Sequence, residues 1–77
     1  MSDRLPVVSG DEAVRAFCRS GYEVTRQKGS HVRLRDPQRP QRSPLSIPRH
    51  AELKPGLLRR LLRDAGLSIE DFRDLLR

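Results

Sequence analysis

The sequence predicts a small α+β domain, in which a three-stranded antiparallel sheet carries helices on one face. Apolar residues recur at helical spacing near both ends of the chain, whereas residues 22–35 and 45–47 show the period of strands. Gly29 and Ser30 separate two strand-like runs, which are therefore expected to form a hairpin. The predicted order is helix, three strands, helix and a short C-terminal helix, within a single domain covering residues 1–77.

The first helix is expected over residues 10–20. Ser9, followed three residues later by Glu12, matches the capping-box pattern that begins a helix. Phe17 and Cys18 fall in the apolar stripe and are predicted to be buried. Gly21 can end the helix.

The first two strands are expected to flank the Gly29-Ser30 turn. In the first, Tyr22, Val24 and Arg26 alternate with polar residues. In the second, the apolar residues Val32 and Leu34 share one face, and the other face carries His31, Arg33 and Arg35. His31 is therefore predicted to face away from the core and to be available for a function.

Residues 36–44 form a polar, proline-rich segment with no core signal, and a loop is predicted there. Arg39 and Arg42 are either phosphate contacts from this loop or ordinary solvated charges. The third strand, residues 45–47, lies between Pro44 and Pro48, which suits the edge of a sheet.

Two helices are expected to follow. Pro55 suits the first position of a helix over residues 55–65, and Gly66 suits its end. Ser68 is expected to cap a last helix with an apolar face that includes Phe72. If this helix does not fold back onto the core, its face is a candidate surface for a partner.

Positive charge is concentrated in the middle of the chain. The net charge is +6, yet residues 26–60 alone hold ten Lys or Arg side chains against Asp36 and Glu52. Clustering of this kind indicates a polyanionic partner, and nucleic acid is the expected one.

The compartment expected is the cytoplasm. Cys18 is the one cysteine, so no internal disulfide can form, and an unpaired thiol suits a reducing environment. No apolar run approaches the length of a membrane span, and no membrane association is expected.

The residue types narrow the possible chemistry. Two His and one Cys, without metal-ligand spacing, predict no metal site, and the absence of a glycine-rich phosphate loop argues against nucleotide hydrolysis. No cofactor is expected. RNA cleavage remains open, because the ribose 2′-hydroxyl is a nucleophile within the substrate. It needs a group to take its proton and cations to stabilise the phosphorane. Imidazole suits the first role, so His31 is the predicted catalytic residue, with Lys28 beside it.

A wider set of residues is predicted to contact RNA. They come from the hairpin, from the end of the third strand and from the start of the helix over residues 55–65, where backbone N–H groups attract phosphate. The set is Arg26, Lys28, Ser30, Arg33, Arg35, Arg49, His50, Lys54, Arg59 and Arg60. His50 is either a second acid–base group or a loop residue that contacts solvent or phosphate.

Four segments in order carry a resemblance to a known family. They are Arg26-Gln27-Lys28-Gly29-Ser30-His31, Ile47-Pro48-Arg49-His50, Leu53-Lys54-Pro55-Gly56-Leu57-Leu58 and Ala65-Gly66-Leu67. Over roughly residues 8–72 the chain resembles the HicA family of small mRNA-cleaving toxins from prokaryotic toxin–antitoxin pairs. Many relatives carry a second His directly after the first, where this chain has Val32.

The resemblance implies a double-stranded-RNA-binding-domain-like α-β-β-β-α fold, a catalytic histidine at His31 and a HicB-type antitoxin partner. Three hypotheses follow: a metal-independent mRNA endoribonuclease, a non-catalytic RNA-binding module of the same fold, and a protein whose C-terminal helix docks a partner. The RNA sequence cleaved and the oligomeric state stay open.

Overall fold

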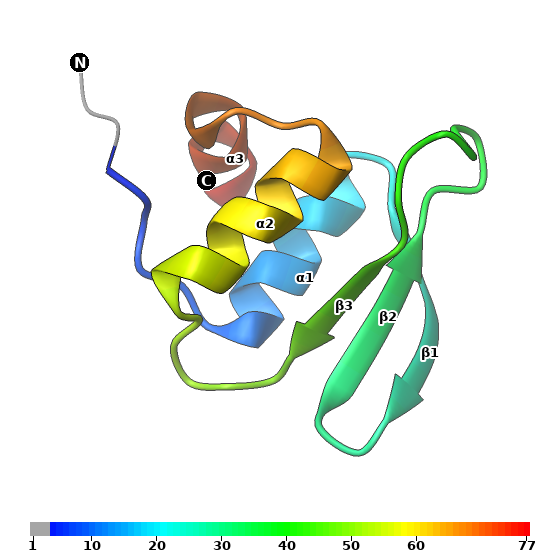
Figure 1. Cartoon of the computed structure of the whole chain (residues 1–77), viewed down its shortest axis with the longest axis horizontal. Coiled ribbons are helices and arrows are strands. Elements are labelled where there is room, and N and C mark those ends of the chain that lie inside the picture. Colours follow the sequence, from blue (N-terminus) through cyan, green and yellow to red (C-terminus); the bar gives the residue numbers. More distant parts are fainter. Residues whose placement is uncertain (1–3) are drawn as a thin grey trace.

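The computed structural model describes residues 4–77 and has the predicted α+β architecture, with every expected element in its expected order (Figure 1). The elements are α1 (Gly10–Arg19), β1 (Glu23–Lys28), β2 (His31–Arg35), β3 (Leu45–Pro48), α2 (Pro55–Ala65) and α3 (Ile69–Leu76). The helices gather on one side of the sheet. Among residues 4–77, none of these helices is long and apolar enough to cross a membrane.

Helix α1 begins at the predicted capping box. Ser9 Oγ accepts a hydrogen bond from the Glu12 N–H at 3.1 Å, and Glu12 Oε1 accepts one from the Ser9 N–H at 2.8 Å. The helix ends where the Gly21 N–H donates to the Cys18 carbonyl and the Tyr22 N–H donates to the Phe17 carbonyl. The Phe17 and Tyr22 rings meet edge to face, 6.1 Å apart, so this turn also starts the core.

The sheet is antiparallel with β2 at its centre, in the order β1-β2-β3. Val32 and Leu34 of β2 are buried and alternate with exposed residues, as predicted. Leu45 and Ile47 of β3 continue the buried face, and β3 is the edge strand expected from its flanking prolines. Strand β1 forms the opposite edge and is exposed along its whole length.

The helices α1 and α2 cover the apolar face of the sheet. Helix α1 approaches the end of β3 so closely that a Cβ on Gly10 would lie 1.9 Å from the Pro48 carbonyl oxygen. The Gly10 N–H donates to the His50 carbonyl at 2.9 Å. Only glycine fits this contact, which fixes the end of the sheet against the start of the helix.

Helix α3 folds back and packs against α1, away from the sheet (Figure 1). Phe72 is completely buried and its ring lies 5.2 Å from that of Phe17. Ser68 and Asp71 form a capping box at the start of the helix. Because the apolar face of α3 is part of the core, the hypothesis of a partner-docking C-terminal helix loses its premise.

Candidate functional site

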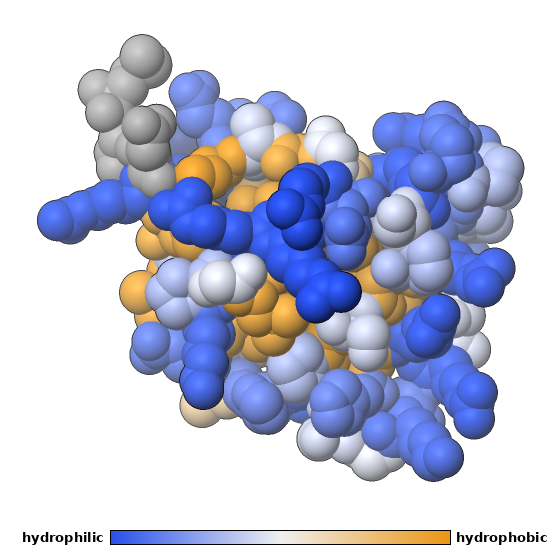
Figure 2. Space-filling view, viewed as in Figure 1, coloured by the Kyte–Doolittle hydropathy of each residue, from blue (hydrophilic) through white to orange (hydrophobic). Residues whose placement is uncertain are grey.

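The outer face of the sheet, opposite the helices, carries the predicted catalytic residue. His31 and its neighbours at alternate positions, Arg33 and Arg35, are exposed, whereas Val32 and Leu34 between them point into the core. In Figure 2 the hairpin and the loop over residues 36–44 form a hydrophilic side of the molecule, while hydrophobic side chains gather around the helices. A core role for His31 is therefore excluded.

A β-bulge in β1 determines which side chains accompany His31. Val24 pairs with Leu34, but the next pair is Arg26 with Arg33, so Thr25 is an extra residue without a partner. The Thr25 hydroxyl donates to the Arg33 carbonyl at 3.3 Å. Residues directly opposite each other in an antiparallel pair share a face. The bulge thus brings Arg26 onto the outer face.

Without the bulge, simple alternation from Val24 would leave Arg26 on the helix side. The sequence pattern alone had put Arg26 on the same side of the strand as Tyr22 and Val24, and the bulge corrects that expectation. It also makes Lys28, rather than Gln27, the partner of His31. No residue type in this stretch signals the bulge, which is defined only by the register of the hairpin.

These side chains surround a shallow depression with a volume of about 250 Å³. Its lining residues come from all three strands: Arg26, Lys28, His31, Arg33 and Ser46. Ser46 is the cross-strand neighbour of Arg33. One imidazole, three cations and a hydroxyl border this space, and no carboxylate does. The three cations are suited to bind an anion, and the imidazole is suited to remove a proton from a group beside that anion.

The hairpin turn beside His31 is fastened to the end of β3. Gly29 adopts φ +58°, a left-handed conformation that a side chain disfavours, although no neighbouring atom would touch one. The Ser30 carbonyl accepts a hydrogen bond from the Arg49 N–H at 2.6 Å, and His31 pairs with Pro48. Ser30 thus serves the turn, and the turn holds the backbone of His31 in place.

The structure does not bring Arg49 and His50 into this depression. The Arg49 guanidinium forms a two-point ion pair with Asp11, Nε to Oδ1 at 2.9 Å and Nη2 to Oδ2 at 3.2 Å. These hydrogen bonds lower the pKa of Asp11 and raise the pKa of Arg49. The side chain of His50 is exposed and does not line the depression around His31.

The basic residues of α2 form a separate group. Lys54 precedes the helix without a side-chain hydrogen bond to its first turn, and that turn contains no acidic residue. Lys54, Arg59 and Arg60 are all exposed. Arg60 lines a depression of about 260 Å³ together with Ser46, which also borders the depression around His31.

The loop over residues 36–44 is built around a buried carboxylate that sequence reasoning missed. Asp36 is only 5% exposed, and its Oδ2 lies 2.8 Å from Arg42 Nη1. Arg42 also stacks over the Tyr22 ring at 4.3 Å and donates to the carbonyls of Ser20 and Ala65. Arg42 is therefore part of the fold, which removes both readings proposed for it from the sequence. Arg39 remains exposed, 3.6 Å from Asp36.

Hydrogen bonds lower the pKa of the Asp36 carboxyl despite its burial. Burial acts to raise its pKa, but the bonds from Arg42 and from the N–H groups of Gln38 and Arg39 outweigh burial, and the pKa lies below its ordinary value. The Asp-Pro-Gln order, in which an Asp side chain bonds to the backbone two residues on, was the available sequence signal.

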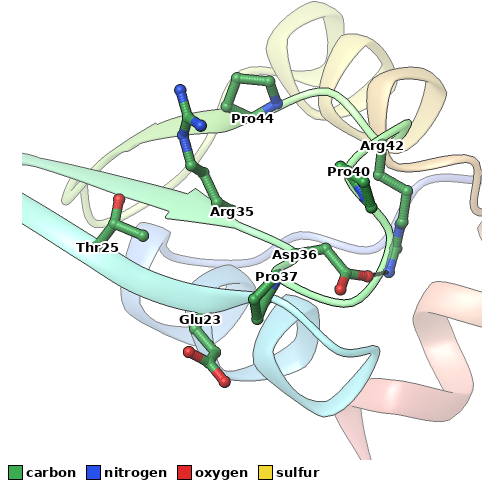
Figure 3. A pocket seen from close by; sticks show the side chains of 8 residues that line it. All are labelled: Glu23, Thr25, Arg35, Asp36, Pro37, Pro40, Arg42 and Pro44. Carbon is green, nitrogen blue, oxygen red and sulfur yellow. Dashed lines mark hydrogen bonds and ion pairs between the residues drawn. The ribbon is translucent and has the colours of Figure 1, made fainter.

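A larger pocket, with a volume of about 360 Å³, lies between this loop and the sheet (Figure 3). Its lining includes three prolines from the loop, Pro37, Pro40 and Pro44, and three residues from the strands, Glu23, Thr25 and Arg35. The sequence had placed Arg35 among the RNA contacts but had not predicted a pocket there.

Metal-ligating side chains do not cluster in the described part of the chain: residues 4–77 contain no group of three His, Cys, Asp or Glu that could hold an ion. Cys18 is half-buried, and burial raises the pKa of its thiol, so it is poorly suited to act as a nucleophile at neutral pH.

Comparison with known protein families finds a family model that matches most of the chain. The family described as the HicA toxin of bacterial toxin–antitoxin systems matches residues 10–67, more than half of the sequence. The matched segment starts with α1 and includes the whole sheet and α2. No curated protein matches the chain. The resemblance identified from the four sequence segments is confirmed.

Proposed function

The chain belongs to the HicA toxin family, and on that premise we propose that it is an mRNA-cleaving endoribonuclease with His31 as its acid–base residue. The observation that carries the proposal is the depression on the outer face, where His31 stands among Arg26, Lys28 and Arg33. A site with these residue types is suited to bind the phosphate of RNA and to take a proton from the ribose beside it.

The reaction follows from the chemistry of RNA. His31 takes the proton of a ribose 2′-hydroxyl, and the oxygen attacks the adjacent phosphorus. The bond from phosphorus to the 5′-oxygen then breaks, and that oxygen leaves with the electron pair and takes a proton from water. Lys28, Arg26 and Arg33 stabilise the extra negative charge of the phosphorane. Since the nucleophile is already held beside its phosphorus, no metal ion is needed to generate it.

One observation favours the alternative, a non-catalytic RNA-binding module of the same fold. The residues that line the depression include one imidazole and no second group of similar acidity to protonate the leaving oxygen. Position 32, where many relatives have another His, holds a valine that is only 5% exposed and points into the core. Loss of that second group lowers the rate but still leaves a base, cations and water.

Membership of a toxin–antitoxin family indicates an antitoxin partner, and we propose a HicB-type protein. Acidic groups on that protein would complement the cations around His31, and opposite charges on the two surfaces speed association. We also propose that the toxin acts in the cytoplasm, where its mRNA substrate is found.

The experiment compares three proteins on a long single-stranded RNA, both in excess EDTA and without it: the wild type, His31→Ala and His50→Ala. His50→Ala is the matched control, because it removes the other imidazole of the chain from a position outside the depression. Cleavage and binding are measured in parallel. The proposal expects His31→Ala to lose cleavage by at least about 100-fold while its RNA affinity changes little, and His50→Ala to keep both.

Each other result has a definite meaning. Equal cleavage by wild type and His31→Ala would remove His31 from the mechanism. Tight binding without cleavage by any of the three proteins, with or without EDTA, would replace the nuclease with the RNA-binding module. Cleavage that disappears in EDTA for the wild type would contradict a metal-independent reaction.

A further inference from the structure

The pocket between the sheet and the loop over residues 36–44 continues the outer face beyond the depression around His31. Arg35 follows Arg33 on the same face of β2, two residues further along. Thr25 precedes Arg26 in β1, and Pro44 lies two residues before Ser46. Since a strand advances by about 3.3 Å per residue, Arg35 lies about 13 Å from His31 along β2. An RNA strand placed over His31 along the sheet therefore extends toward this pocket.

The walls of the pocket differ from those of the depression around His31. Pro37, Pro40 and Pro44 present apolar rings and Glu23 and Asp36 contribute carboxylates, whereas the other site is bordered mainly by cations and has no carboxylate. Figure 3 shows the loop curving around the space, with Pro40 and Arg42 across from Thr25 and Arg35. Apolar side chains can pack against the face of a nucleobase. The volume, about 360 Å³, lies within the range of small-ligand sites.

The wall formed by the loop is held in shape before any ligand arrives. Asp36 accepts hydrogen bonds from Arg42 and from the N–H groups of Gln38 and Arg39, at 2.8, 3.0 and 3.1 Å. The side chain of Arg42 is only 9% exposed and connects the loop to the end of α1 and to Ala65. Because the loop is already ordered, it loses less conformational entropy when a ligand binds.

We propose that this pocket binds the base of a nucleotide that flanks the cleaved bond in the same RNA strand. The proline rings contact the base, and Arg35 contacts its phosphate. The Thr25 hydroxyl, which donates to the Arg33 carbonyl, accepts a hydrogen bond from the polar edge of the base. The inference rests on the proposed function for its substrate, but the pocket itself can be tested without cleavage. It assigns the proline-rich loop a role in selecting where RNA is cut.

The test is an NMR titration of the ¹⁵N-labelled protein with the four ribonucleoside 5′-monophosphates, and with ribose 5-phosphate, which lacks a base. The proposal expects at least one mononucleotide to shift the amide signals of Thr25, Arg35 and Gln38. It expects that nucleotide to bind at least about fivefold more tightly than ribose 5-phosphate, which shifts mainly signals around His31.

A double variant, Pro40→Ala with Pro44→Ala, truncates two of the apolar rings. It is expected to abolish the fivefold preference for the nucleotide and to retain the response to ribose 5-phosphate. Gln41→Ala is the control, because Gln41 is exposed in the same loop and does not line the pocket. Identical responses to the nucleotides and to ribose 5-phosphate would overturn the proposal, as would base-dependent shifts located elsewhere.

Mapping of cut sites separates this inference from the proposed function. If the wild type cleaves RNA, it should prefer certain bases at a flanking position, and the double variant should lose that preference while still cutting. A preference unchanged in the double variant would overturn the inference and leave the nuclease intact. If the wild type cuts nothing, the proposed nuclease fails, and the titration alone decides whether the pocket binds a base.

Discussion

Lys28 and Gln27 are neighbours in the chain, but the bulge at Thr25 gives them different partners across the sheet. Lys28 pairs with His31 on the outer face, and Gln27 pairs with the buried Val32. The strand therefore presents a cation on the outer face at one position and a neutral amide on the helix side at the next. This difference is a direct consequence of one extra residue in β1.

The first prediction compares Lys28→Ala with Gln27→Ala in RNA binding. Loss of one phosphate contact should reduce the slope of log affinity against log salt by about 0.7 for single-stranded RNA. We expect this reduction for Lys28→Ala and an unchanged slope for Gln27→Ala, measured by fluorescence anisotropy at several salt concentrations. Equal slopes for the two variants would mean that the outward position given to Lys28 by the bulge does not make it a phosphate contact.

At the scale of elements, the contact between the start of α1 and the end of β3 supports the site. Gly10 leaves no room for a Cβ beside Pro48, and Pro48 in turn pairs with His31. Asp11 of the same helix holds Arg49, the next residue along the chain. The first turn of α1 thus fixes the strand that flanks the candidate catalytic residue.

The second prediction concerns Gly10→Ala. The added methyl group must displace backbone, and overpacking of this kind costs about 1–3 kcal/mol. Because 1 kcal/mol shifts Tm by about 4–8 °C in a domain of this size, calorimetry should show a clear decrease. The site should also suffer, with RNA cleavage reduced even at temperatures where the variant is folded.

Gly56→Ala is the control for that substitution. Gly56 lies in the first turn of α2, with no atom within 4 Å of an added Cβ, so alanine there should leave Tm unchanged or raise it. A Tm of Gly10→Ala equal to that of the wild type would show that α1 and β3 are free to separate.

Sequence patterns predicted the helices and strands but only part of the candidate site. The capping boxes of α1 and α3 join residues three apart, and the outward position of His31 follows from alternation within one strand, so both were predictable. Arg42, by contrast, bonds to groups 22 and 23 residues away, and Arg49 to one 38 residues away. Such pairs exist only once the chain has folded, as does the register that creates the bulge.

At the scale of the whole molecule, the buried Asp36 makes stability depend on pH. Its pKa in the folded protein lies below the value of about 3.9 for an unperturbed Asp. The ionised form therefore stabilises the fold above that value, and the contribution is lost as pH falls through the lower folded pKa. Acid should weaken the attachment of the loop over residues 36–44 to the rest of the protein.

The third prediction uses Asp36→Asn in urea unfolding between pH 7 and pH 2. The variant should be less stable than the wild type at pH 7. When the pH is lowered below about 4, the urea midpoint of the variant should decrease less than that of the wild type. It retains the contributions of Asp11 and Glu12, whose pKa values are also lowered, by the bond to Arg49 and by the Ser9 backbone. Asp74→Asn, at an exposed position of α3, is the control. Parallel pH profiles for Asp36→Asn and the wild type would contradict this account.

We propose that the outer face cleaves RNA by using the ribose 2′-hydroxyl as nucleophile, with His31 as the base. The most direct measurement is the identification of the new ends on RNA cut by the wild type. We expect a 2′,3′-cyclic phosphate, or the 3′-phosphate formed when it hydrolyses, on one fragment and a 5′-hydroxyl on the other. A 3′-hydroxyl with a 5′-phosphate would show that water attacked the phosphorus, and would contradict attack by the 2′-hydroxyl.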